Sequence, residues 1–68
     1  MKKTNALGEK LQQRRRDMDY SQEKLATLIY ASSSAISRYE TGEVIPPLDV
    51  LLLIADALDV EITELLSR

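Results

Sequence analysis

The sequence predicts an all-α domain of five short helices joined by short loops. Its apolar residues recur at helical spacing, and helix caps and breakers stand between the apolar segments. No segment alternates apolar and polar residues in the way a half-buried strand does. Because there is no internal repeat and no linker, we expect a single domain over residues 1–68, with a flexible N-terminal arm at residues 1–5.

The first helix is expected from Ala6 to Asp17, with Leu7, Leu11 and Met18 marking its buried side. Serine caps then mark the starts of the second and third helices. The expected caps and inner apolar residues of these two helices are Ser21, Leu25, Ala26, Ile29 and Ser32. The third helix is expected to run to about Thr41, where Gly42 stops it.

Two successive prolines precede the fourth helix, since proline is tolerated at a helix start. The expected buried stripe of this helix consists of Leu48, Leu51, Leu52, Ala55 and Leu58. Residues 59–62 form a short connection, and residues 63–67 form a last helical turn that carries Leu65 and Leu66.

Composition excludes several classes of site. With no Cys and no His, the chain lacks disulfides, thiolate metal sites and the commonest metal ligand, so we expect no metal and no cofactor. Its serines have no plausible base and its carboxylates are dispersed, so we do not expect an enzyme. The longest apolar run, residues 50–55, is too short to span a membrane, and no secretory signal opens the chain. We therefore expect a complete cytoplasmic protein with no membrane partner.

Charge is divided unequally along the chain. The net charge is −2, but residues 1–38 carry +4 and residues 39–68 carry −6. A uniformly basic nucleic-acid binder is excluded by this balance. A protein with a basic face and an acidic back is consistent with it.

The segments 21–26 and 32–40 have the layout of a helix-turn-helix, which presents its second helix to the major groove of DNA. Helical spacing puts four polar residues on the outer side of that second helix: Ser33, Ser34, Ser37 and Arg38. Small hydroxyl side chains let a helix approach base edges, and Arg38 can donate two parallel hydrogen bonds to guanine. The alternative interpretation is an ordinary solvated helix face.

Two further residues are candidates for phosphate contacts. Gln22 stands at the first turn of the second helix, where free backbone N–H groups attract anions. Its alternative is an exposed glutamine without a partner. The residues of the run 14–16 point in different directions on a helix, so one or two of them can face DNA. We expect Arg16 to be the one that contacts a phosphate.

With these residues in register, the chain resembles the Cro/repressor-type helix-turn-helix proteins of the XRE family over residues 7–66. The resemblance rests on Leu11, Arg15, the block 21–26, Ser32, the run 36–40, Gly42, Pro46 and the helix over residues 51–60. It implies a compact, five-helix, lambda-repressor-like domain that binds double-stranded operator DNA as a homodimer.

The resemblance also implies roles for particular residues. The implied base-reading positions are Ser33, Ser34 and Arg38, with Ser37 close by; the implied phosphate contacts are Gln22 and Thr41; and the implied ion pair is Arg15 with Glu40. Tyr30 stands where the family usually has a left-handed glycine, so the turn is either strained or differently shaped. Glu43 stands in a loop where basic residues often touch phosphates.

The first hypothesis is therefore a sequence-specific, double-stranded DNA-binding transcriptional regulator of the repressor type. Its helix at about 33–41 is expected to enter the major groove, and its dimer interface is expected at Leu65 and Leu66. The alternative is a protein-interaction module, such as the antitoxin partner of a toxin. Leu28 and Tyr30 have no obvious burial and could belong to such a partner surface.

Overall fold

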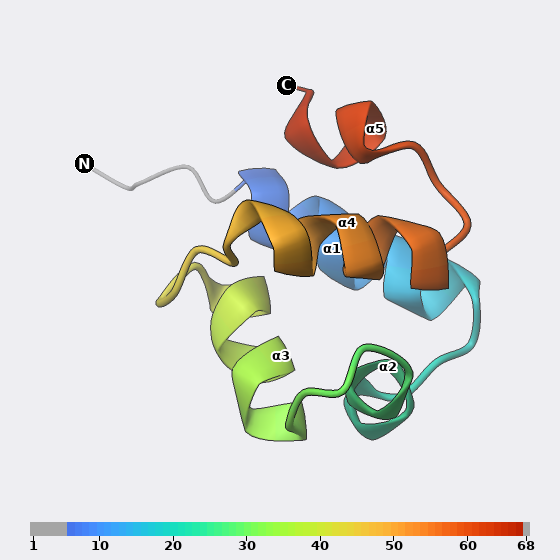
Figure 1. The fold of residues 1–68 in the computed structure, drawn as a ribbon, viewed down its shortest axis with the longest axis vertical. Helices are drawn as coiled ribbons and strands as arrows, with labels where there is room; N and C mark the ends of the chain where they lie inside the picture. The colour runs from blue at the N-terminus through green and yellow to red at the C-terminus, as the bar shows by residue number, and fades with distance from the viewer. Residues whose placement is uncertain (1–5, 68) are drawn as a thin grey trace.

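The fold of the chain was obtained as a computed structural model, which describes residues 6–67 (Figure 1). The helices are α1 (Ala6–Asp17), α2 (Gln22–Leu28), α3 (Ser33–Thr41), α4 (Leu48–Ala57) and α5 (Ile62–Leu66). No strand occurs within residues 6–67. The prediction of an all-α, five-helix domain is confirmed, whereas the predicted arm at residues 1–5 lies outside the described residues.

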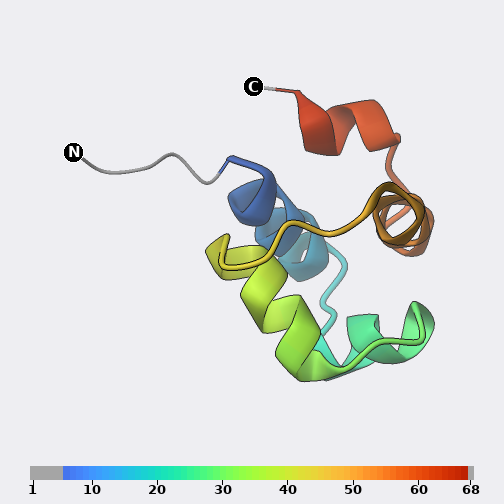
Figure 2. The same ribbon diagram turned by 60° about the vertical axis from the view of Figure 1, so that its left-hand side comes forward.

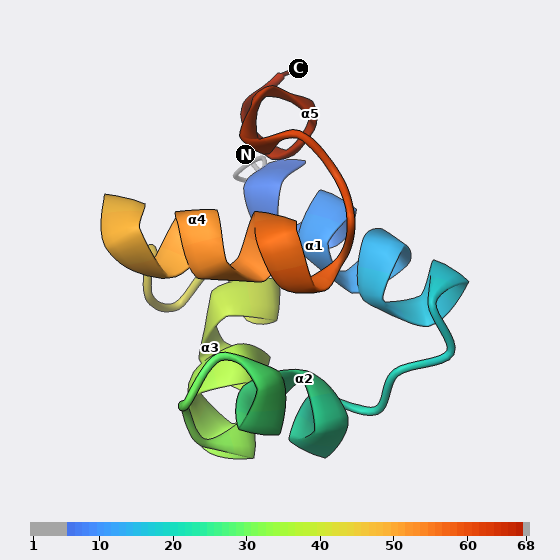
Figure 3. The ribbon, with the colours of Figure 1, turned by 45° about the vertical axis from the view of Figure 1, so that its right-hand side comes forward.

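Three levels of helices make up the molecule. Helices α1 and α4 cross its middle, α5 lies at one end, and α2 and α3 lie together at the opposite end (Figures 1 and 3). Turning the molecule brings α4 into view along its axis, with α5 on one side of it and the α2–α3 pair on the other (Figure 2). Helices α2 and α3 pack on each other, and α3 also packs on α1. The α2–α3 pair is thus carried on the rest of the domain.

A single apolar core joins all five helices. Its buried members are Leu11, Leu25, Ala26, Ile29, Ile36, Ile54, Ala55, Leu58 and Leu65. Tyr20 and Tyr39 pack on the edge of this cluster. Each fully buried leucine or isoleucine contributes about 1.5–3 kcal/mol relative to an exposed one, so the core supplies the main driving force for folding.

Local capping explains why the helices begin and end where they do. The Ser21 hydroxyl oxygen accepts a hydrogen bond from the Lys24 backbone N–H at 2.9 Å, and Ser32 accepts one from the backbone N–H of Ala35 at 3.1 Å. Gly42 ends α3 in the left-handed conformation, with a φ of 85°. The predicted caps of α2 and α3 are therefore confirmed.

The predicted buried stripe of α4 is wrong at two positions. Leu48 and Leu52 are 63% and 51% exposed, and the core receives Ile54 instead, together with Leu51 and Ala55. Most residues of this ten-residue helix are apolar. Because apolar residues of α4 occur all around the helix axis, their spacing alone does not identify the side that faces the core.

The ends of the outer helices also differ from prediction. Met18 follows the last residue of α1 and is exposed, rather than lying on the buried side of that helix. Leu65 is fully buried, so the expected exposed pair at the end of the chain is reduced to Leu66. Lys10 of α1 holds α5 in place, because its ammonium group donates hydrogen bonds to the carbonyl oxygen and the hydroxyl of Ser67. With α5 fixed on α1 and α4, Leu65 faces inward.

The turn between α2 and α3 adopts the left-handed conformation without glycine. Tyr30 has a φ of 61°, and the Ala31 backbone N–H closes the turn on the carbonyl oxygen of Ala26 at 2.8 Å. A residue with a Cβ in this conformation costs about 1–2 kcal/mol. The turn therefore keeps the left-handed shape and is strained.

Tyr30→Gly is expected to raise the free energy of unfolding by up to about 1 kcal/mol, because it relieves this strain while adding backbone freedom to the unfolded chain. The Tyr30 side chain is 91% exposed, so little buried area is lost. Urea denaturation followed by circular dichroism measures the change. Tyr30→Ala is the matched control: it keeps the Cβ and should give no gain. An equal gain from both variants would trace the effect to the tyrosine ring instead.

Candidate nucleic-acid interface

The predicted base-reading residues lie on one side of α3. Ser33, Ser34 and Arg38 are exposed, and Ser37 is half-buried beside them. The opposite side of the helix is fixed in the domain by Ile36, which is fully buried. α3 therefore presents a polar surface of small hydroxyl groups and one arginine.

Arg38 is available to a ligand. Its guanidinium makes no hydrogen bond or ion pair with any residue between 6 and 67. The side chain lies along a surface hollow of about 210 Å³ that Ala35, Tyr39 and Val44 also line. An arginine in this position can turn both N–H donors of its fork toward the edge of a guanine.

The C-terminal end of α3 is attached to α1 by a buried ion pair. Arg15 Nε donates to Glu40 Oε2 at 2.6 Å, and Arg15 Nη2 donates to Glu40 Oε1 at 3.2 Å. A third donor of the same guanidinium, Nη1, bonds the carbonyl oxygen of Tyr20 at 2.7 Å. One arginine thus connects α1 with α3 and with the loop before α2.

Two glutamines complete the surroundings of Glu40. The side-chain amide nitrogens of Gln12 and Gln22 donate to Glu40 Oε1 at 3.3 Å and 3.0 Å. Gln22, a predicted phosphate contact, is therefore held beside the last turn of α3. One of its two amide N–H donors remains for a ligand. These contacts could not be predicted from the sequence, because they join side chains distant along the chain.

The other two predicted phosphate contacts, Thr41 and Arg16, are not among the residues named above that bond Glu40. Thr41 is exposed, and its hydroxyl bonds the carbonyl oxygen of Arg38 at 3.2 Å. Arg16 is exposed in the last turn of α1. Its neighbour Arg14 pairs with Asp17 at 3.6 Å. The phosphate roles of Gln22, Thr41 and Arg16 stay predictions.

The surroundings of Glu40 determine its ionisation. Burial by itself raises the pKa of this carboxyl group. Hydrogen bonds from Arg15, Gln22 and Gln12, together with the positive charge of Arg15, outweigh burial and hold the pKa of Glu40 below its ordinary value. The carboxylate is therefore ionised at neutral pH and keeps its partners in place.

Comparison with known proteins identifies this arrangement. The profile described as helix-turn-helix matches residues 11–65. The chain belongs to the Cro/repressor-type helix-turn-helix family. The expected family resemblance is thereby confirmed, and with it the lambda-repressor-like fold.

Two curated relatives are transcription regulators. The HTH-type transcriptional activator BcrR of Enterococcus faecalis is 44% identical over 60 residues, which are 88% of this chain and 29% of that protein. The cryptic phage CTXphi transcriptional repressor RstR of Vibrio cholerae is 37% identical over 62 residues, which are 91% of this chain and 55% of that protein. The chain thus spans about a third to a half of these relatives.

A solved structure of similar shape is the P22 c2 repressor protein in complex with a synthetic operator. The two chains superpose with a TM-score of 0.88 at 31% identity, over 94% of this chain and 97% of the other. These relatives are regulators and not enzymes, in agreement with the expectation from composition.

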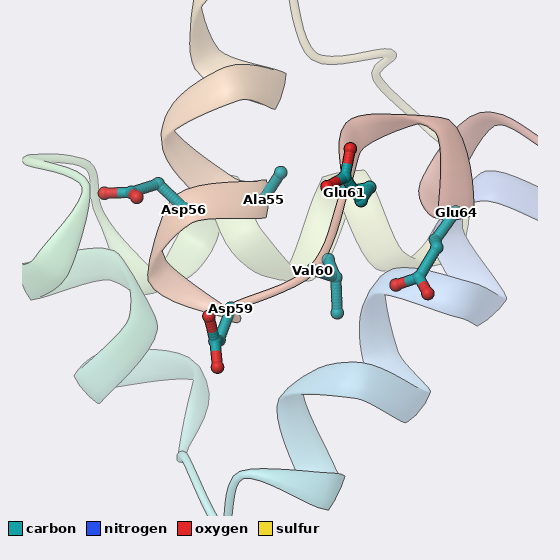
Figure 4. A pocket seen from close by; sticks show the side chains of 6 residues that line it. All are labelled: Ala55, Asp56, Asp59, Val60, Glu61 and Glu64. Carbon is teal, nitrogen blue, oxygen red and sulfur yellow. The ribbon is translucent and has the colours of Figure 1, made fainter.

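A second hollow of this helix-turn-helix domain lies between α4 and α5. It has a volume of about 250 Å³ and is lined by Ala55, Asp56, Asp59, Val60, Glu61 and Glu64. Figure 4 shows Asp56 and Glu64 at opposite ends of the group of lining residues, with the carboxylate of Asp56 pointing away from the group. Across residues 6–67, no group of acidic side chains is arranged to hold a metal ion. Nor does this part of the chain contain a helix long and apolar enough to cross a membrane.

The lowered pKa of Glu40 makes stability depend on pH. A carboxyl group whose pKa is lower in the folded state stabilises the fold above its unfolded pKa. That contribution is lost as the pH falls from about 4.5, the ordinary value, through the folded pKa. We expect the free energy of unfolding, measured by urea denaturation at decreasing pH, to fall in this range.

Glu40→Gln is the matched variant for this pH dependence. It leaves the Arg15 charge buried without its carboxylate and should lower the free energy of unfolding by about 3–5 kcal/mol at pH 7. The free energy of unfolding of this variant should also change less than that of the parent as the pH falls below 4.5. Arg15→Met combined with Glu40→Gln removes the unpaired charge and should recover part of the loss. If the single variant showed the same acid dependence as the parent, the dependence would have to arise at other carboxylates.

Proposed function

We propose that this chain is a sequence-specific, double-stranded DNA-binding transcriptional regulator whose α3 enters the major groove. The observation that carries the proposal is the exposed Arg38, standing among small serines on a helix whose opposite side is fixed by buried Glu40 and Ile36. The regulator names of the relatives, and the operator bound by the P22 c2 repressor, support it.

Symmetric pairing is part of the proposal. Helix-turn-helix proteins commonly bind as dimers to two half-sites about one helical turn, ~34 Å, apart. The curated relatives include an activator and a repressor, so DNA binding of this kind can serve either activation or repression of transcription. Binding to genomic DNA would take place in the cytoplasm.

Selection of bound duplexes from a random pool, at low salt, tests the proposal. We expect enrichment of a two-fold symmetric motif that contains a guanine at the position read by Arg38. No enriched motif would contradict the regulator function. That outcome would favour the alternative, a protein-interaction module such as an antitoxin, for which exposed Leu28 and Tyr30 offer a surface.

Arg38→Ala is expected to remove the preference for one guanine in each half-site, a loss of about 1–3 kcal/mol of discrimination. The selection, repeated with the variant, measures the change at each position. Arg14→Ala is the matched control, because Arg14 is an exposed arginine that already pairs with Asp17. An unchanged motif with Arg38→Ala would remove Arg38 from the base-reading residues.

Arg16→Ala is expected to weaken binding to all duplexes alike, because a phosphate contact carries no sequence information. Titrations at several salt concentrations should show a plot of log affinity against log salt that is shallower by about one unit. Arg14→Ala again serves as the control. A change at one base position, or an unchanged slope, would contradict the phosphate role of Arg16.

A further inference from the structure

The turn between α2 and α3 carries a large side chain that the fold does not use. Tyr30 is 91% exposed, whereas Tyr20 and Tyr39 pack on the edge of the apolar core. Across residues 6–67, the hydroxyl group of Tyr30 has no hydrogen-bond partner. The ring and the hydroxyl of this residue therefore contribute little to the packing of the domain.

The backbone at Tyr30 is unfavourable for a residue of this size. Among residues 6–67, the non-glycine residues with a positive φ are Asp19 at 60°, Tyr30 at 61° and Asp59 at 57°. Aspartate tolerates the left-handed conformation because its short polar side chain bonds the local backbone, whereas a bulky residue there is an outlier. Strained residues of this kind cluster at functional sites. The turn is strained by a side chain that returns no buried contact, which points to a binding role.

The position of the turn relates Tyr30 to the base-reading end of α3. Tyr30 precedes Ser33 by three residues, so their Cα atoms are at most about 11 Å apart. The segment that joins α2 to α3 lies with these helices at the end of the molecule opposite α5 (Figures 1 and 3). A helix in the major groove lies between two phosphate backbones, in a channel about 12 Å wide. A side chain this close to the first turn of α3 is within reach of the backbone that borders the groove.

We propose that the Tyr30 hydroxyl donates a hydrogen bond to a phosphate oxygen of the bound duplex, at the edge of the groove that α3 enters. This inference rests on the proposed DNA binding, to which it adds one contact. Tyrosine is among the side chains that contact phosphates in complexes with DNA. Such a contact fixes the position of the protein on the duplex and carries no sequence information.

The surroundings of Tyr30 favour a phosphate over a protein partner. Residues 24–39 include no acidic residue, and Glu40, which follows them, is buried. Nothing along this segment therefore repels a phosphate. Residues 31–34 are one alanine and three serines, so the apolar side chain nearest before the turn that is also exposed, Leu28, has no apolar continuation beyond it. Two exposed apolar residues cover far less than the area of about 800 Å² that each partner buries in a stable protein pair.

Tyr30→Phe tests the hydroxyl group, because it keeps the ring and the Cβ of the strained turn. Its melting temperature should equal that of the parent, while its affinity for the selected duplex falls about three- to tenfold for each bound copy. A neutral hydroxyl displaces no counterion, so the slope of log affinity against log salt should not change. The selected motif should not change either. Fluorescence anisotropy titrations at several salt concentrations measure both affinity and slope.

Tyr30→Gly separates binding from stability. This variant should unfold less readily than the parent and yet bind the duplex at least as weakly as Tyr30→Phe does. A purely structural role of Tyr30 would move stability and affinity in the same direction. Loss of affinity with Tyr30→Gly but not with Tyr30→Phe would assign the effect to the shape of the turn, and would overturn the hydroxyl contact.

A charge placed at the same position gives an independent test. Near a phosphate, Tyr30→Lys should steepen the plot of log affinity against log salt by about one unit for each bound copy. Leu66→Lys is the matched control, because Leu66 is an exposed residue of α5, at the opposite end of the molecule (Figure 1). It should leave the slope as in the parent. An equal change in slope from both lysine variants would overturn the proposed position of Tyr30.

The outcomes distinguish this inference from the proposed function. If the parent enriches no duplex, both are overturned. If the parent binds its selected duplex and Tyr30→Phe binds it equally well, DNA binding stands and the phosphate contact is overturned. The exposed turn would then be left to a protein partner.

Discussion

The buried carboxylate of Glu40 is the contact on which the geometry of this domain depends. It accepts hydrogen bonds from Arg15 and Gln12 of α1 and from Gln22 of α2, while it belongs to the last turn of α3. Three helices that pack mainly through apolar side chains are thereby held in one orientation. Apolar contacts are not directional, whereas a charged and fully bonded carboxylate tolerates few arrangements. The angle at which α3 is presented is set at this point.

The same contact separates the functions of the two sides of α3. The inner side is attached through Glu40, so the outer side needs no partner within residues 6–67 and can carry Ser33, Ser34 and Arg38 in solvent. Strain at Tyr30 is compatible with this division, because the apolar core and the carboxylate together fix the helices on both sides of the turn. The fold therefore carries an unfavourable residue in the turn without losing the shape of the helix pair.

Sequence reasoning succeeded where local chemistry decides the structure. Ser21, Ser32 and Gly42 act on neighbouring backbone groups, so the ends of α2 and α3 could be read from the chain. The predicted burial of Leu52 and the predicted exposure of Leu65 are wrong, because the packing of distant helices decides which of several apolar residues is buried. At the candidate site, helical spacing predicted the outer residues of α3. Helical spacing could not predict the contacts of Gln12 and Gln22 with Glu40, because side chains far apart in sequence meet only in the folded molecule.

The acidic residues around α4 and α5 have a consequence for the encounter with DNA. Glu61 and Glu64 lie at α5, at the end of the molecule opposite α2 and α3 (Figure 1), and Asp56 and Asp59 lie at the end of α4 and just after it (Figure 4). In the proposed complex with DNA, the phosphate backbone would repel the acidic residues at α5 and attract Arg38 of α3, so the charges favour an approach with α3 leading. A domain of net negative charge can in this way approach a polyanion productively, with orientation supplied by the charges that face away from it.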